Sequence, residues 1–98
     1  MKWTEPMPDI FLQFCRWFHQ DIRHSYPSLD HAASGFVVQL DAAAAAELKS
    51  FLGYLLASDA SDQELQELWS ERGSDWGVSP IRPFFERVRA QLAGGSGP

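Results

Sequence analysis

Apolar residues recur three and four positions apart along most of the chain, which is the spacing of helices that bury one face. From Asp9 to about Ser25 the apolar positions fall within an arc of about 100° on a helical wheel. They predict a first helix after a loose lead-in over residues 1–8. Tyr26-Pro27 is expected to end it, because the residue before a proline is pushed out of the α region. The buried face of this helix would consist of Phe11, Phe14, Cys15, Phe18 and Ile22.

The next stretch predicts a second and a third helix. Ser28 is suited to cap the second helix, whose apolar positions are Ala32, Ala33, Phe36 and Val37. Gly35 weakens this pattern, so residues Phe36–Leu40 could instead be a short strand. We favour a helix, because a lone strand has no partner elsewhere in the chain. Asp41 caps the third helix, where five consecutive alanines precede an apolar stripe of Leu48, Phe51, Leu52, Leu55 and Leu56.

Two more helices complete the pattern. After a turn at residues 58–60, Ser61-Asp62-Gln63-Glu64 has the Ser-x-x-Glu form of a capping box. The fourth helix stops at Gly73, a favoured residue after a helix end, and buries Leu65, Leu68 and Trp69. Ser79 and Pro80 fit the N-cap and first position of a fifth helix. Pro83 falls in its first turn, and its inner face contains Ile81, Phe84, Phe85, Val88 and Leu92.

Five amphipathic helices with short connections predict an all-α fold, a single compact bundle. The 98 residues leave room for one domain, which we place at residues 1–93, followed by a flexible Gly/Ser-rich tail at 94–98. The start lacks the apolar core of a signal peptide, and no run approaches the ~20 apolar residues that span a bilayer. A single cysteine cannot form an intrachain disulfide. We therefore expect a cytoplasmic protein without a membrane partner.

Catalytic chemistry has one weak candidate, the group His19, Asp21 and His24, in which two imidazoles and a carboxylate could bind metal or transfer protons. On a helix only Asp21 and His24 are neighbours, and His19 lies about 140° away from His24. The i, i+4 spacing of a helical metal pair is absent. Cys15 lies within the apolar stripe, where a thiol behaves as a small hydrophobe. We expect no enzymatic activity, no cofactor and no metal.

Charge is distributed unevenly along the chain. The formal net charge is −5, and residues 41–75 carry eight acidic against two basic side chains. A negative balance disfavours binding to nucleic acid, which requires clustered lysine and arginine. It is compatible with a basic protein partner. The acids that we assign to a candidate binding surface are Asp59, Asp62, Glu64, Glu67, Glu71 and Asp75.

Three of these acids, Glu64, Glu67 and Glu71, would stack along the exposed side of the fourth helix, at i, i+3 and i+7. A solvated face is the alternative interpretation, since the helix dipole favours acids near an N-terminus, where Asp62 and Glu64 lie. Glu71 and Asp75 occupy the opposite end, where the dipole disfavours them. We therefore favour a binding face.

Aromatic residues near these acids offer apolar anchors for a partner. Trp76 lies in a loop beside glycine, and tryptophan is enriched at interface hot spots. It could equally fold over the bundle as a lid. Tyr54 is a second candidate anchor, whereas Trp69 is better explained as a core residue.

The aromatic run Phe14-Cys15-Arg16-Trp17 leads directly into the tetrapeptide Phe18-His19-Gln20-Asp21. With Tyr26 and the later helices, the chain resembles the immunity proteins of bacterial contact-dependent growth inhibition systems over roughly residues 10–92. The tetrapeptide is the specific part of this resemblance, and the remainder is general helical patterning. The family often has an aromatic residue after the aspartate, where this chain has Ile22.

The resemblance implies a non-enzymatic cytoplasmic protein that binds the toxin domain of a neighbouring cell's inhibitor and blocks it. Such toxins are often nucleases with basic clefts, which an acidic helix face would complement. We expect a monomer that binds a cognate toxin domain and no nucleic acid. The alternative is a small helical adaptor that binds an unrelated intracellular protein. If the acidic helix is not the binding surface, the next candidates are the polar face of the first helix and the face that carries Arg82, Arg87 and Arg89.

Overall fold

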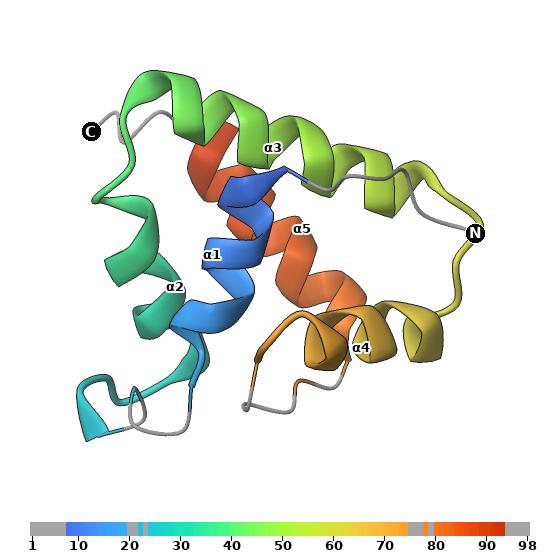
Figure 1. Ribbon diagram of the computed structural model, residues 1–98, viewed down its shortest axis with the longest axis horizontal. Coiled ribbons are helices and arrows are strands. Elements are labelled where there is room, and N and C mark those ends of the chain that lie inside the picture. Colours follow the sequence, from blue (N-terminus) through green and yellow to red (C-terminus); the bar gives the residue numbers. More distant parts are fainter. Residues whose placement is uncertain (1–7, 20–21, 23, 75–77, 79, 94–98) are drawn as a thin grey trace.

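The helical prediction is confirmed by the computed structural model, which describes residues 8–19, 22, 24–74, 78 and 80–93. These residues contain no strand, and their helices pack into one bundle (Figure 1). The bundle measures 36 × 27 × 22 Å along its principal axes. Its helices are α1 (Asp9–Trp17), α2 (Leu29–Val37), α3 (Ala42–Ala57), α4 (Asp62–Glu71) and α5 (Ile81–Ala93).

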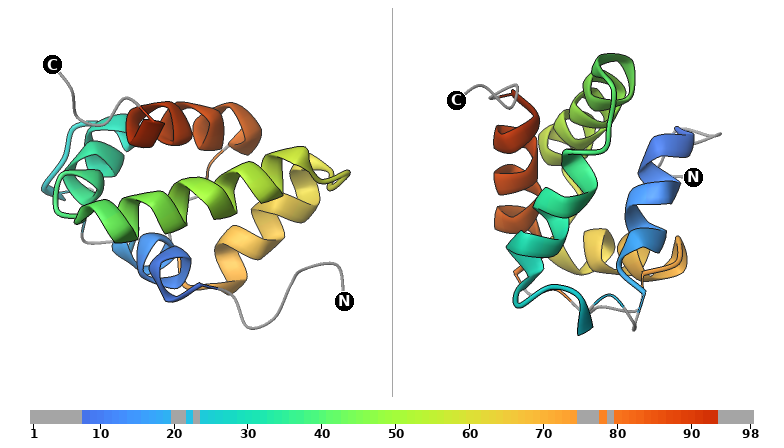
Figure 2. Two further views of the ribbon diagram at one scale, coloured as in Figure 1. Left: turned by 90° about the horizontal axis from the view of Figure 1, so that it is seen from above. Right: turned by 90° about the vertical axis from the view of Figure 1, so that its left-hand side faces the viewer.

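The longest helix, α3, lies across one side of the bundle and packs most extensively against α5 (Figure 1). Helix α5 also contacts α2 and α4, so it connects the two ends of the molecule. Helix α1 packs against α3, and α1 and α5 lie on either side of α3 in both views of Figure 2. This arrangement leaves one long side of α4 exposed.

The core is built around a cluster of aromatic rings from four helices. The Phe14 ring has its centroid 5.3 Å from that of Phe18, 5.5 Å from Phe36, 5.4 Å from Trp69 and 6.2 Å from Phe84. Tilted and edge-on aromatic pairs contribute about 0.5–1.5 kcal/mol each beyond the area they bury. Dense aromatic packing therefore compensates for the small size of the domain. The prediction that Trp69 is a core residue is confirmed, since it is 1% exposed.

Helix starts follow the predicted capping residues. Ser28 and Asp41 each accept a hydrogen bond from the backbone N–H three residues later, at 3.2 and 2.8 Å. The capping box is confirmed: Ser61 Oγ accepts from the Glu64 N–H at 3.1 Å, and the Glu64 carboxylate accepts from the Ser61 N–H at 2.8 Å. Gly73 follows the end of α4 with φ +115°, a left-handed conformation that favours glycine.

The predicted extent of the first helix is wrong, because α1 ends at Trp17 and not near Ser25. The Trp17 Nε1–H donates to the carbonyl of Ala32 at 2.8 Å, and the Trp17 ring packs 6.1 Å from that of Tyr26. These contacts join the end of α1 to α2 and to the segment before it. Phe18 remains fully buried after the turn. The apolar pattern therefore predicted correctly that Phe18 and Ile22 are buried, although both lie beyond the end of α1.

Other predictions concern the ends of helices. The strand alternative for Phe36–Leu40 is wrong: α2 continues to Val37, and the chain then turns into the cap of α3. The prediction that Pro80 is the first residue of the fifth helix is wrong by one residue, because α5 begins at Ile81. The predicted N-cap Ser79 and the tail at 94–98 lie outside the described residues.

Candidate protein-binding surface

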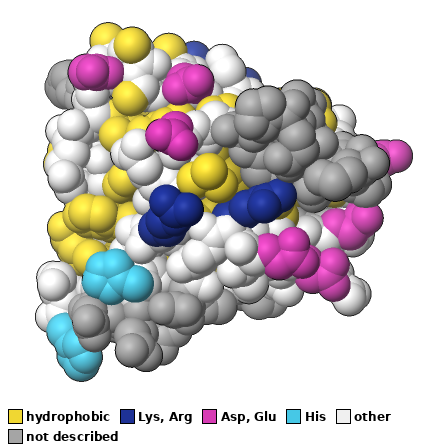
Figure 3. All heavy atoms as spheres, in the orientation of Figure 1, with side chains coloured by type: hydrophobic (Ala, Val, Ile, Leu, Met, Phe, Trp, Pro, Cys, Tyr) yellow, Lys and Arg dark blue, Asp and Glu magenta, His cyan; other side chains and the backbone are white. Residues whose placement is uncertain are grey.

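Helix α4 has two different sides. Leu65, Leu68 and Trp69 face the core and are at most 2% exposed. The other side forms a shallow hollow on the surface, and every residue that lines it has a polar or charged side chain. In Figure 3, acidic side chains gather at the edge of the molecule where Figure 1 shows α4. The residues that line the hollow are Gln63, Gln66, Glu67, Ser70 and Glu71.

Two of the candidate acids are already used within the fold. The Asp62 carboxylate accepts a hydrogen bond from Arg82 Nε at 3.3 Å. The Glu64 carboxylate is occupied by the Ser61 N–H in the capping box. Both residues lie in the first turn of α4, where the helix dipole also favours a negative charge. Their positions are explained by the structure of the helix start.

Glu67 and Glu71 are the acids on α4 that have no such structural role. Both are exposed, and neither carboxylate lies within 4.0 Å of a cationic nitrogen in the described part of the chain. Glu67 accepts one long hydrogen bond, 3.4 Å, from the side chain of Gln63. Like charges four residues apart on a helix repel each other, and Glu71 also lies at the end that the dipole disfavours. A cationic partner would relieve both effects.

The remaining candidates are Tyr54, Asp59, Asp75 and Trp76. Tyr54, on α3, is 41% exposed, and its ring packs 5.7 Å from that of Phe51. It therefore combines a supported ring with an accessible edge. Asp59 is exposed in the connection between α3 and α4. Asp75 and Trp76 lie outside the described residues.

Two of the arginines that offered an alternative surface make contacts inside the molecule. Arg82 donates to the carbonyl of Leu56 at 2.9 Å and to that of Ala60 at 2.6 Å. Arg87 pairs with Asp30 at 3.2 Å. Arg82 thus holds the start of α5 to the connection between α3 and α4. Sequence reasoning missed this role, because the acceptors are backbone carbonyls distant in the sequence.

Among the residues that the structure describes, the histidines belong to no cluster of metal-ligand side chains. His19 and His24 are exposed, and Asp21 lies outside the described residues. His31 Nδ1 lies 2.6 Å from Ser28 Oγ, as part of the start of α2. Across the described residues, no cluster of three His, Cys, Asp or Glu side chains could hold a metal ion.

Cys15 is fully buried in the core. Burial raises the pKa of its thiol to about 12, although the positive charges of Arg72 and Arg16 oppose this shift. The thiolate is the nucleophilic form, so the thiol of the folded protein is poorly suited to covalent chemistry. Cys15 lies on the buried side of α1 and packs in the core as a small apolar side chain would.

Comparison with known proteins gives no relative: no family model, curated protein or solved structure matches this chain. The resemblance to growth-inhibition immunity proteins therefore stays a prediction. None of the described helices is both long enough and apolar enough to cross a lipid bilayer.

Proposed function

We propose that the protein is an immunity protein that binds and blocks the toxin domain of a contact-dependent growth inhibition system. The observation that carries the proposal is the pair of exposed, uncompensated carboxylates of Glu67 and Glu71 on α4. The resemblance of the aromatic run and the Phe18-His19-Gln20-Asp21 tetrapeptide to immunity proteins supports this choice of family. The all-α fold is compatible with it.

Binding through α4 would use a surface that is already rigid. The capping box fixes its first turn, and Gln66 Nε2 donates to the carbonyl of Val78 at 2.6 Å. Arg82 fixes the preceding connection through its contact with Ala60. A preorganised surface loses little conformational entropy on binding, so more of the interaction energy contributes to affinity.

The carboxylates of Glu67 and Glu71, without a cationic neighbour among the described residues, define the expected partner, a toxin domain with a basic cleft such as that of a nuclease. Glu67 and Glu71 would accept charge-assisted hydrogen bonds from lysines or arginines that otherwise hold the substrate phosphates. They would also accelerate encounter through long-range attraction. Tyr54, 41% exposed on α3, is the candidate apolar anchor. Inhibition would be stoichiometric, by occlusion of the cleft.

The test measures association with the C-terminal toxin domain encoded beside this gene. The variant Glu67→Gln/Glu71→Gln removes two charges from α4 without touching the capping box. The control Glu47→Gln/Glu86→Gln removes two exposed charges from α3 and α5. We expect the α4 variant to associate about tenfold more slowly at low salt, with a smaller difference at high salt, and the control to change little.

Two results would contradict the proposal in different ways. Equal association rates for the α4 variant and its control would show that another face binds the toxin. Absence of binding at micromolar concentrations would remove the immunity function itself. In that case a helical adaptor for an unrelated protein becomes the better hypothesis.

A further inference from the structure

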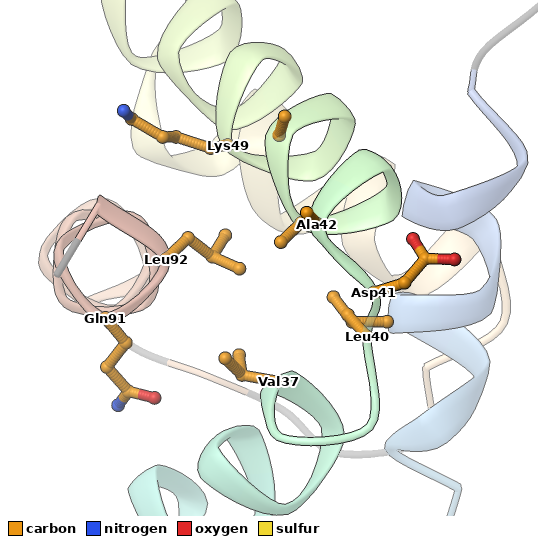
Figure 4. A pocket seen from close by; sticks show the side chains of 9 residues that line it. Val37, Leu40, Asp41, Ala42, Lys49, Gln91 and Leu92 are labelled. Atoms are coloured by element: carbon orange, nitrogen blue, oxygen red, sulfur yellow. The ribbon is translucent and has the colours of Figure 1, made fainter. Parts of the chain in front are cut away.

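A groove of about 400 Å³ lies at the end of the bundle opposite to α4, between the end of α2, the first half of α3 and the last turns of α5. Figure 4 shows the side chains of Val37, Ala42 and Leu92 directed toward the space between the helices. The Asp41 carboxylate is turned away from that space. The apolar lining consists of Val37, Leu40, Ala42, Ala45, Ala46 and Leu92.

One edge of this groove is cationic. Lys49 is part of the lining, and Gly53 follows it by one helical turn on α3. The guanidinium of Arg89 lies over Gly53, so close that a Cβ at this glycine would be 3.1 Å from Arg89 Nε. Residues four apart on a helix have Cβ atoms about 5–6 Å apart, so the Lys49 side chain starts from the same side of α3 as the one that Arg89 covers.

These cations are not neutralised by neighbours. Neither Lys49 nor Arg89 has a carboxylate within 4.0 Å among the residues that the structure describes. Arg82 and Arg87, on the same helix as Arg89, are both paired with aspartates. In a protein of net charge −5, two cations on the same side of α3 without a described carboxylate partner, one of them lining an apolar groove, favour an anionic ligand with an apolar part.

We propose that this groove binds a medium-chain fatty acid. The carboxylate would lie between Lys49 and Arg89, and the aliphatic chain would cross Leu92 into the space beside Val37 and Ala42. Lys49 lies seven positions after Ala42, which corresponds to about 10 Å along α3 at 1.5 Å per residue. This span suits a chain of the length of octanoate. A neutral amphiphile would leave the cations unpaired, and a small anion would leave the apolar walls in water.

The test is a titration of the full chain with octanoate, followed by the amide NMR signals of the residues that line the groove. We expect saturable shifts that are centred on Val37, Ala42 and Leu92. Octanamide, which lacks the charge, and acetate, which lacks the chain, should each bind at least about tenfold more weakly. Equal binding of octanamide would overturn the role of the cations, and equal binding of acetate would overturn the role of the groove.

A matched pair of variants tests the position of the chain. Ala42 lines the groove, whereas Ala43, also exposed in the first turn of α3, does not. Replacement of either alanine by leucine adds the same volume at an exposed position, so both variants should fold. Ala42→Leu should weaken octanoate binding about tenfold or more, and Ala43→Leu should leave it unchanged. Equal effects of the two substitutions would overturn the proposed placement.

A second pair tests the head group. Lys49→Gln and Arg89→Gln should each weaken octanoate binding about fivefold, because each removes one charge-assisted contact. Arg87→Gln, which removes an arginine of α5 outside the groove, is the control and should have no effect. The groove and the acidic side of α4 lie at opposite ends of α3, so octanoate binding and toxin binding can succeed or fail independently.

Discussion

Replacement of Arg82 by methionine should destabilise the bundle by much more than the loss of its ion pair. The guanidinium donates to two backbone carbonyls, of Leu56 and Ala60, as well as to the Asp62 carboxylate. A hydrogen bond from a charged donor contributes about 1.5–3 kcal/mol. The side chain is 28% exposed, so we use the lower limit for both carbonyls, which gives about 3 kcal/mol.

The ion pair adds little to this value. Asp62 is 50% exposed, and exposed pairs contribute at most about 0.5–1 kcal/mol. Methionine keeps much of the aliphatic stem of arginine, so the loss reflects the hydrogen bonds more than packing. Substitution of Arg82 should therefore lower the free energy of unfolding much more than substitution of Asp62, although the two residues form one ion pair.

Urea unfolding, followed by far-UV circular dichroism and tryptophan fluorescence, measures these differences. We expect a loss of about 3 kcal/mol for Arg82→Met and about 0.5 kcal/mol for Asp62→Asn. Arg87→Met is the control, because the Arg87–Asp30 pair is half-exposed on both sides and Arg87 donates to no backbone carbonyl among the described residues. The reasoning fails if Arg82→Met costs no more than Asp62→Asn, since the carbonyl contacts would then contribute nothing.

Three further predictions concern single positions. Gly35→Ala should lower the free energy of unfolding by about 2 kcal/mol, because the new Cβ would lie 2.6 Å from Tyr26 Cζ. In a Tyr26→Ala background the same substitution should cost less, and additive effects in this double-mutant cycle would argue against the contact. Ser61→Ala should cost about 1 kcal/mol in urea unfolding, and no loss would mean that the cap is not formed in solution. Cys15 should resist Ellman's reagent until the protein is unfolded. Burial raises the pKa of the Cys15 thiol from 9.0 to about 12, so the free energy of unfolding should fall as the pH rises through this interval. The decrease should be less steep in Cys15→Ala.

Helix starts could be predicted well because their signals are local. Ser28, Asp41 and the Ser61-to-Glu64 capping box each act within four residues, so they can be recognised without the fold. The end of α1 has no comparable signal, since no glycine or proline occurs between residues 9 and 25. A contact with Ala32, on the following helix, accompanies the change of direction at Trp17. Such a tertiary contact is not encoded by the sequence spacing.

For the candidate surface, too, the sequence predicted what depends on local spacing and missed what depends on tertiary contacts. The helical spacing of Glu64, Glu67 and Glu71 placed these acids on α4, but it could not distinguish which carboxylates are free. That distinction depends on the capping geometry at Ser61 and, for the neighbouring Asp62, on an arginine twenty residues later. The proposed roles of Asp75 and Trp76 stay predictions.

The two-sided construction of α4 has a consequence for how such a protein can diversify. Its packing is concentrated in three inward side chains, and its starting turn depends on Ser61 and Glu64. Positions 63, 67, 70 and 71 are exposed, and none belongs to the hydrophobic core. Mutational drift at these four positions can reverse charge or change size with little effect on folding. A lineage could therefore acquire a new binding partner through this helix while its interior stays the same.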